Sequence, residues 1–368
     1  PTMLGMMVNA IYNLVDAYFV GSLGTSQMGA ISVVYPLGQV VVGLGLLFGN
    51  GSASYLSRLL GKGDKEKANQ VASTALYSSI TVGAIMIILS IIFLRPILKF
   101  LGATDSIMPY AITYASIYII SCIFNVFNVT MNNIVTSEGA AKTTMCALMT
   151  GAILNIGLDP VFIYILNMGV AGAAIATAIS QIVSTLVYLT FILRKKSTYH
   201  FRIRNFSFTK DIMSEIFKIG IPTLVFQILT SLSISFVNTK SMVYGDSVIA
   251  GMGAVTRIVS MGSLMVFGFI KGFQPIAGYS YGAKKFYRLQ EAIKTSILWS
   301  TIFCVIYGLI LAIFSKGIIS QFTKMDLDMI RVGTQSLRIN GFSFMLFGFY
   351  TVYSSLLLAL GKGLAGFF

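Results

Sequence analysis

Residues 154–160 (Leu-Asn-Ile-Gly-Leu-Asp-Pro) combine side chains that could do chemistry with an environment that makes them costly. They lie within residues 143–166, which are otherwise apolar and long enough to cross a bilayer. A carboxylate in hydrocarbon costs about 2.5–3.5 kcal/mol on insertion scales, so we expect Asp159 to have a function. Asn155 lies four residues earlier and therefore on the same helix face. Pro160 frees backbone carbonyls beside the acid.

The composition indicates a membrane protein. Hydrophobic residues make up 56% of the 368 residues and charged residues 10%, against about 25% charged in a soluble domain. The three cysteines lie in apolar segments, which predicts neither a disulfide framework nor a zinc site. We expect no cofactor.

Apolar segments of about 20 residues or more are separated by short polar connections, which predicts about ten membrane-spanning helices. The predicted helices are 3–21, 31–58, 68–94, 109–137, 143–166, 169–193, 219–244, 249–281, 288–314 and 329–360.

The net charge of +14 follows the predicted topology. Most Lys and Arg residues lie in alternate loops, above all in residues 58–67, 194–218 and 284–294. The positive-inside rule therefore predicts that these loops and the N-terminus are cytoplasmic. This distribution argues against a nucleic-acid partner.

Some predicted helices carry polar side chains that lipid would not favour. In the first, Asn9, Tyr12, Asn13 and Asp16 recur at spacings of three and four, which predicts a stripe facing protein or a watery cavity. In the second half of the chain, predicted helices contain three cations that could pair with other helices or extend toward water, namely Lys240, Arg257 and Lys271.

The second half of the chain repeats the first. Aligning Gly61 with Gly282 also aligns Gly51 with Gly272 without a gap. A unit of six helices is even, so both units enter the membrane from the same side, as parallel repeats do. The sequence ends before the counterparts of helices five and six, so we expect about ten helices of a parent with twelve.

The expected fold class is an all-α polytopic membrane protein with two pseudo-symmetric six-helix bundles. We assign an N-terminal lobe to residues 1–200, a cytoplasmic linker to 201–218 and an incomplete C-terminal lobe to 219–368. The amphipathic stretch at 209–218 fits an interfacial helix against anionic lipid.

Four elements of the sequence together resemble the multidrug and toxic compound extrusion (MATE) transporters. The elements are Asn13-Leu14-Val15-Asp16 with Gly21, residues 154–160, residues 169–177 (Gly-Val-Ala-Gly-Ala-Ala-Ile-Ala-Thr), and Gln274-Pro275 with Gly278-Tyr279 and Tyr281-Gly282-Ala283. The resemblance covers nearly the whole chain in order and spacing. It implies two six-helix lobes around a cavity that opens alternately to each side. It also implies export of bulky cationic or amphipathic compounds, driven by Na⁺ or H⁺.

The resemblance further implies a cation-coupling site in the N-terminal lobe. One branch of the family uses an Asp on helix one, an Asn and an Asp on helix five and a Thr on helix six. The matching residues are Asp16, Asn155, Asp159 and Thr177, and Tyr12 and Tyr114 match tyrosines near that site. Another branch has acids in the C-terminal lobe. This chain has Asn238 at that position on helix seven and no acid between Ile330 and Leu360, so a second site is not expected.

The depths of these residues agree with a single site. At 1.5 Å per residue, Asp16, Asp159 and Thr177 lie roughly 8 to 12 Å inside the outer ends of their helices, and Asn155 lies one turn deeper. Their oxygen atoms would suit Na⁺, in which case they are metal ligands, while two desolvated carboxylates could instead hold a proton. A helix bent at Pro160 is a candidate for the element that responds.

We therefore expect a cation-coupled antiporter of the plasma membrane that acts as a monomer on organic cations or amphipathic drugs. The alternative is a flippase or exporter of lipid-linked sugar precursors, which would need a cationic cavity such as Lys240, Arg257 and Lys271 could supply. An enzyme is not expected, because no His-rich metal motif and no Ser/His pair is visible.

Overall fold

The structure is a computed structural model that describes residues 1–21, 25–101, 103, 105, 107–242, 246–321 and 327–367. The described residues form helices and their connections, and none of them forms a β-strand. This confirms the all-helical class.

Ten long helices account for most of the residues that the structure describes. They are α1 (Thr2–Gly21), α2 (Thr25–Lys62), α3 (Lys65–Ile92), α5 (Met108–Ser137), α6 (Ala141–Pro160), α7 (Gly169–Leu193), α8 (Lys210–Met242), α9 (Asp246–Gly282), α10 (Phe286–Ile313) and α12 (Leu327–Ala359). Short helices are α4 (Leu94–Phe100), the π-helical η1 (Val161–Ile165), the 3₁₀-helical η2 (Ile203–Asn205), α11 (Ser315–Ile319) and α13 (Gly363–Phe367).

The long helices confirm a polytopic membrane protein. In the part of the chain that the structure describes, nine helices are long and apolar enough to cross a bilayer, and α1 adds the apolar stretch Thr2–Tyr12. The helices follow the predicted ranges because each apolar run must satisfy its backbone within itself in lipid.

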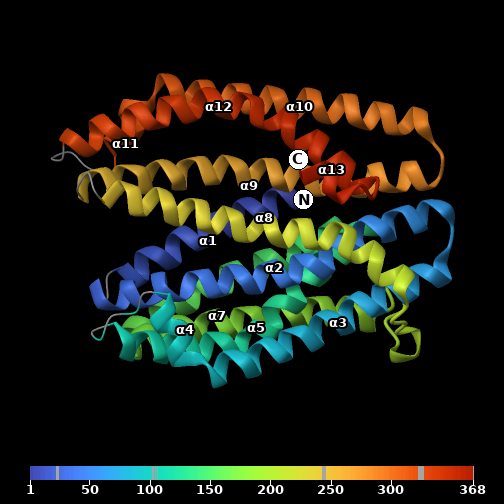
Figure 1. Ribbon diagram of the computed structural model, residues 1–368, viewed down its shortest axis with the longest axis horizontal. Coiled ribbons are helices and arrows are strands. Elements are labelled where there is room, and N and C mark those ends of the chain that lie inside the picture. The colour runs from blue at the N-terminus through green and yellow to red at the C-terminus, as the bar shows by residue number, and fades with distance from the viewer. Residues whose placement is uncertain are drawn as a thin grey trace.

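The helices lie roughly along one direction in two groups (Figure 1). Helices α1 to α7, which we call the first half, occupy one side, and α8 to α13, the second half, occupy the other. Helix α1 packs between α6 and α9, and α2 packs against both α8 and α9. The turns at 62–65 and 282–286 and the connector at 194–209 lie together at one end, which we call the basic end.

The helix predicted from residue 219 already begins at Lys210. The amphipathic stretch expected to lie against lipid instead packs on protein, because Ile212, Met213 and Ile216 join the buried cluster that α2, α3 and α5 also form. The segment 201–218, predicted to be a linker, therefore includes the first two turns of α8.

The connector is fastened to the first half by side chains that bond to its backbone. Thr74 of α3 bonds to both the carbonyl and the N–H of Ser207, and Asn69 accepts from the His200 N–H at 2.8 Å. The Glu138 carboxylate accepts from the Thr198 N–H at 2.6 Å. Burial raises the pKa of Glu138, and its hydrogen bonds from Thr198 and Ser197 oppose this shift.

Helices α2 and α8 touch backbone to backbone through a pair of glycines. A Cβ atom on Gly51 would lie 2.4 Å from the Ile216 carbonyl oxygen, and one on Gly220 would lie 2.2 Å from that of Leu47. Since neither neighbour is a flexible side chain, only glycine permits this approach of the two halves.

We predict that Gly220→Ala destabilises the protein by about 1–3 kcal/mol, because the added methyl group forces α2 and α8 apart. The control is Gly253→Ala in α9, where a Cβ atom meets nothing within 4 Å. There alanine is expected to be neutral, or stabilising by up to about 1 kcal/mol through helix propensity. Thermal unfolding of the detergent-purified variants measures both. Equal melting temperatures for the two variants would contradict the proposed contact.

Candidate functional site

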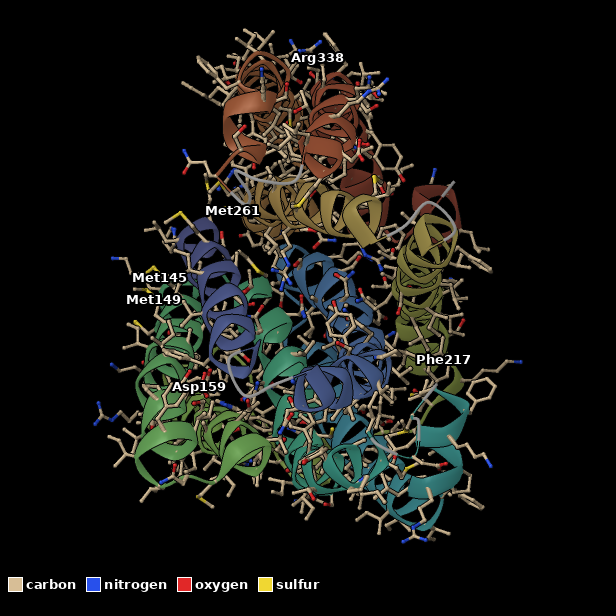
Figure 2. The ribbon with its side chains drawn as sticks, turned by 90° about the vertical axis from the view of Figure 1, so that its left-hand side faces the viewer. Met145, Met149, Asp159, Phe217, Met261 and Arg338 are labelled. Carbon is tan, nitrogen blue, oxygen red and sulfur yellow. The ribbon has the colours of Figure 1, made fainter. Side chains whose placement is uncertain are left out.

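Asp159 lies one residue before the end of α6 and is completely buried, with 0% of its surface exposed. Helix α6 begins at the basic end, so at 1.5 Å per residue Asp159 lies roughly 27 Å from that end. Figure 2 views the molecule along its helices and shows Asp159 inside the group that contains α6 and α7, while Met261 lies on α9. An acid is thus enclosed in protein within a membrane-spanning helix.

Asn155 joins Asp159 to the neighbouring helix α7. Its side-chain amide fits in one orientation, in which Nδ2 donates to Asp159 Oδ2 at 3.1 Å and Oδ1 accepts from the Thr177 backbone N–H at 3.2 Å. Asn155 is 1% exposed and Thr177 is 8% exposed. Three of the four residues predicted to form the coupling site are therefore in contact, and the amide fixes where the carboxylate lies.

The backbone changes its helical form directly after Asp159. Pro160 has no N–H to continue the α-helical ladder, and residues 161–165 form a π-helical turn, in which the Leu166 N–H donates to the Val161 carbonyl at 2.9 Å. The sequence predicted a bend at this proline. A π-turn is common at functional sites because its extra residue is easily redistributed along the helix.

Two glycines bring α7 close to α6 and η1. A Cβ atom on Gly172 would lie 2.8 Å from the Phe162 backbone, and one on Gly151 would lie 2.2 Å from the Ser184 hydroxyl. This close packing explains how the Thr177 N–H comes within reach of the Asn155 side chain. The small residues predicted at the start of α7 therefore serve to let this helix pack closely on its neighbours.

The remaining predicted site residues are less fully described. The side chain of Asp16 on α1 lies outside the described residues, as does that of Lys240. Tyr114 is 8% exposed, stacks on Tyr118 with ring centroids 5.7 Å apart, and belongs to the buried cluster that includes Ile163 of η1. Tyr12 lies on α1, a helix that packs on α6.

Sequence reasoning missed Ser180, which lies one turn from Thr177. Its hydroxyl is buried and has no hydrogen-bond partner among the described residues. The spacing of polar residues along α7 could have indicated Ser180, because they recur on one face of the helix. The residues of this face are Thr177, Ser180, Gln181, Ser184, Thr185 and Tyr188.

That polar face continues toward the basic end as a set of contacts with α5. Thr185 donates to Asn128 Oδ1 at 3.0 Å, and Asn128 in turn donates to the Gln181 side chain at 2.8 Å. One turn further, Asn132 donates to the Tyr188 hydroxyl at 3.3 Å and accepts from Lys271 Nζ at 2.8 Å. A cation of the second half thus bonds to the first half.

Helices α2 and α9 meet near the basic end through a reciprocal contact. A Cβ atom on Gly61 would lie 2.2 Å from the Tyr279 carbonyl oxygen, and one on Gly282 would lie 2.1 Å from that of Arg58. The gapless alignment that pairs Gly61 with Gly282 also pairs Arg58 with Tyr279. The repeat-equivalent backbones therefore touch each other in a symmetric way.

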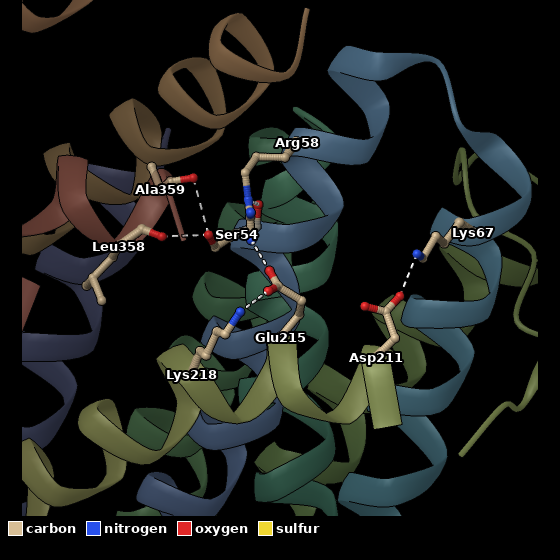
Figure 3. Close-up of polar contacts among 8 residues, drawn as sticks. All are labelled: Ser54, Arg58, Lys67, Asp211, Glu215, Lys218, Leu358 and Ala359. Carbon is tan, nitrogen blue, oxygen red and sulfur yellow. Dashed lines mark hydrogen bonds and ion pairs between the residues drawn. The ribbon is translucent and has the colours of Figure 1, made fainter. Parts of the chain in front are cut away.

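Figure 3 shows the polar contacts that Ser54 and Arg58 of α2 make with other helices. Arg58 of α2 pairs with Glu215 of α8 at 2.9 Å, and Lys218 pairs with the same carboxylate at 2.6 Å. Ser54 donates to the Leu358 carbonyl at 2.6 Å and to that of Ala359 at 3.3 Å, which satisfies acceptors at the end of α12. Sequence reasoning did not single out the Arg58–Glu215 pair, because these residues are separated by 157 positions.

A second ion pair lies nearer the surface. Lys67 of α3 pairs with Asp211 of α8 at 2.6 Å, with side-chain exposures of 36% and 64%, against 15% and 18% for Arg58 and Glu215. The inner pair is therefore the stronger candidate for holding the two halves together, since exposed pairs contribute little.

Known proteins resemble this chain over nearly its full length. The MatE family model matches residues 1–161 and 222–368. The multidrug export protein MepA of Staphylococcus aureus is 31% identical over 366 residues, which is 99% of this chain and 80% of that protein.

Solved structures agree with this comparison. A structure described as the outward-facing conformation of a multidrug resistance MATE family transporter of the MOP superfamily has a TM-score of 0.94 and 27% identity, and the match covers all of this chain and 82% of that one. A crystal structure of MATE in complex with MaL6 gives the same TM-score, identity and coverage. The chain therefore belongs to the MATE family, whose members are transporters and not enzymes.

Proposed function

We propose that this chain exports bulky cationic or amphipathic compounds by alternating access, driven by Na⁺ or H⁺ bound at Asp16, Asn155, Asp159 and Thr177. The observation that carries the proposal is the completely buried Asp159 carboxylate, held through Asn155 to the Thr177 backbone. A buried acid in a spanning helix marks an ion or proton pathway by default. The MepA relatives, which are multidrug export proteins by name, support the class of cargo.

The coupling ion acts by neutralising the site. With a proton or Na⁺ present, the Asp159 carboxylate no longer bears an unbalanced charge in a water-poor environment, so its burial becomes less costly. The adjacent Pro160 and the π-turn of η1 form the element whose helical register responds. Tyr114 of α5 belongs to the buried cluster that includes Ile163 of η1, and Tyr12 lies on α1, which packs on α6.

The moving parts are two repeats related by a twofold axis along the membrane normal. We assign residues 1–200 to one lobe and 219–368 to the other, with the segment 201–218 between them. This assignment is supported by the contacts of Gly61 with Tyr279 and of Gly282 with Arg58, which the repeat alignment makes equivalent. A twofold relation produces such reciprocal pairs of contacts.

The structure corresponds to an outward-facing state in this scheme. Its halves are held together near the basic end by the glycine contacts and by the Arg58–Glu215 pair. The positive-inside rule makes the basic end cytoplasmic, and α1 then runs outward from the side of the membrane on which α2 ends. Similarity to the outward-facing transporter structure supports this state. A monomer in the plasma membrane is sufficient for the cycle.

Asp159→Asn is expected to abolish gradient-driven export while leaving the protein folded, because asparagine keeps the shape but cannot be charged. Ethidium efflux is measured from vesicles under an imposed Na⁺ or pH gradient, which also identifies the ion. The control is Asp328→Asn, an exposed acid in the first turn of α12. Full efflux by the Asp159 variant, or equal loss in both variants, would contradict the coupling role.

Glu215→Gln is expected to increase opening at the basic end about tenfold, because a charged hydrogen bond of roughly 1.5–3 kcal/mol is lost. A cysteine placed at Ser57, which packs against Gly278 between α2 and α9, reports the opening. Its labelling by a membrane-impermeant maleimide is measured in a background where Cys122, Cys146 and Cys304 are alanine.

The matched control for this variant is Asp211→Asn on the same helix. It removes the exposed pair with Lys67 and should change the labelling rate by less than about twofold. If the two variants label equally fast, the inner pair is not the closing contact.

A further inference from the structure

Lys271 is an intramembrane cation that the coupling site does not use. It lies on α9, eleven residues before Gly282, hence roughly 16 Å from the basic end of that helix. Its Nζ donates to Asn132 Oδ1 of α5 at 2.8 Å, across the boundary between the two halves.

Lys271 makes no ion pair with any acid in the described part of the chain. An ammonium group has three protons, and one neutral amide oxygen accepts only part of this donor capacity. A charged side chain at such a depth in the membrane is costly. Membrane proteins retain such residues mainly where they contact a substrate or an ion, or take part in a proton relay. A second, negative partner is therefore expected during the transport cycle.

Lys271 lines a small cavity, and both halves of the protein form its walls. The lining comes from α2, α5 and α9, and its members are Ala53, Ser54, Ser57, Asn133, Thr136, Ser137, Lys271, Gln274 and Pro275. Because α2 and α5 belong to the first half and α9 to the second, separation at the basic end would open this cavity and expose Lys271 to the solvent.

The hydroxyl groups of the cavity are arranged to accept hydrogen bonds. Ser57 donates its proton to the Ala53 carbonyl at 2.9 Å, Thr136 donates to Asn132 at 2.6 Å, and Ser137 donates to Ile134 at 2.7 Å. The Ser57 and Thr136 oxygens keep lone pairs that can accept a hydrogen bond, while the Ser137 oxygen accepts one from the Tyr199 hydroxyl at 3.1 Å. Opening at the basic end would separate Lys271 from Asn132 and from the part of this lining that α2 and α5 supply.

We propose that Lys271 is the recognition site for one anionic group of the cargo, namely a carboxylate, sulfonate or phosphate monoanion on an amphipathic compound. The proposal rests on the alternating access of the proposed function. Cargo enters from the basic end when Asn132 and Lys271 separate, its anionic group takes the place of Asn132, and reclosure returns Lys271 to Asn132. The lining contains a single cation, so it matches one negative charge better than a pyrophosphate.

The repeat provides an internal comparison. The alignment that pairs Gly61 with Gly282 pairs Lys271 with Asn50 of α2, a neutral residue whose amide donates to Thr223 of α8 at 3.3 Å. Both residues thus bridge the halves, and only Lys271 brings charge. Asn50 is the matched position for separating an effect of charge from an effect of bridging.

The experiment uses two dyes that differ in one carboxylate, rhodamine B and its ethyl ester. Gradient-driven export of each from vesicles is compared for the natural sequence, Lys271→Met, Lys271→Arg and Asn50→Ala. Since a charge-assisted hydrogen bond of roughly 1.5–3 kcal/mol is lost, Lys271→Met is expected to lower export of rhodamine B about tenfold or more relative to the ester. Lys271→Arg should restore the preference, and Asn50→Ala should change both dyes equally.

Equilibrium binding of both dyes to the purified variants, followed by fluorescence anisotropy, separates this proposal from the proposed function. If the natural sequence exports neither dye under any gradient, coupled export fails, while a Lys271-dependent preference in binding still supports the recognition site. If Lys271→Met lowers export and binding of both dyes equally, or if the natural sequence shows no preference for the carboxylate dye, the recognition site is wrong.

Discussion

A carboxylate with no exposed surface inside a membrane-spanning helix is the constraint on which the first half of this protein depends. Water cannot solvate Asp159, and lipid offers no hydrogen bonds, so its partners must come from the protein itself. Asn155 provides one of them and is itself fixed by the Thr177 backbone. The glycines at 151 and 172 let α7 approach closely enough for this contact. The proline and the π-turn that follow leave the same region with a helical register that can change.

The boundary between the two halves has a different requirement in the proposed alternating-access cycle, because it must be tight in one state and separable in another. Backbone contacts through Gly51, Gly220, Gly61 and Gly282 give close packing without interlocking side chains. Arg58 and Glu215 add an attraction that is directional and short in range. Such contacts can be broken as a unit, since few side chains must change rotamer when the helices part.

Lys271 connects these two regions. It extends from the second half to Asn132, which bonds to Tyr188 on the same face of α7 that carries Thr177. The proposed ion site and the proposed recognition site therefore contact the same helix at two depths. This arrangement gives occupancy of one site a physical route to the other, and the dye experiment measures the chemical preference of the second site directly.

The sequence by itself determined the all-helical membrane class and most helix ranges, because an apolar run in lipid has to satisfy its own backbone. It also indicated Asp159 and Asn155, since a costly acid and its polar neighbour stand out against an apolar background, while Thr177 was indicated by the resemblance to the MATE transporters. It was wrong about the stretch at 209–218, whose amphipathic pattern fits a lipid surface and a protein surface equally well; only packing of Ile212 and Ile216 on α2 and α3 decided between them. Contacts between distant positions were likewise decided by the tertiary structure. No local pattern pairs Arg58 with Glu215 or Lys271 with Asn132, because a side chain's partner across a helix interface depends on how the helices are rotated and how closely glycine lets them approach.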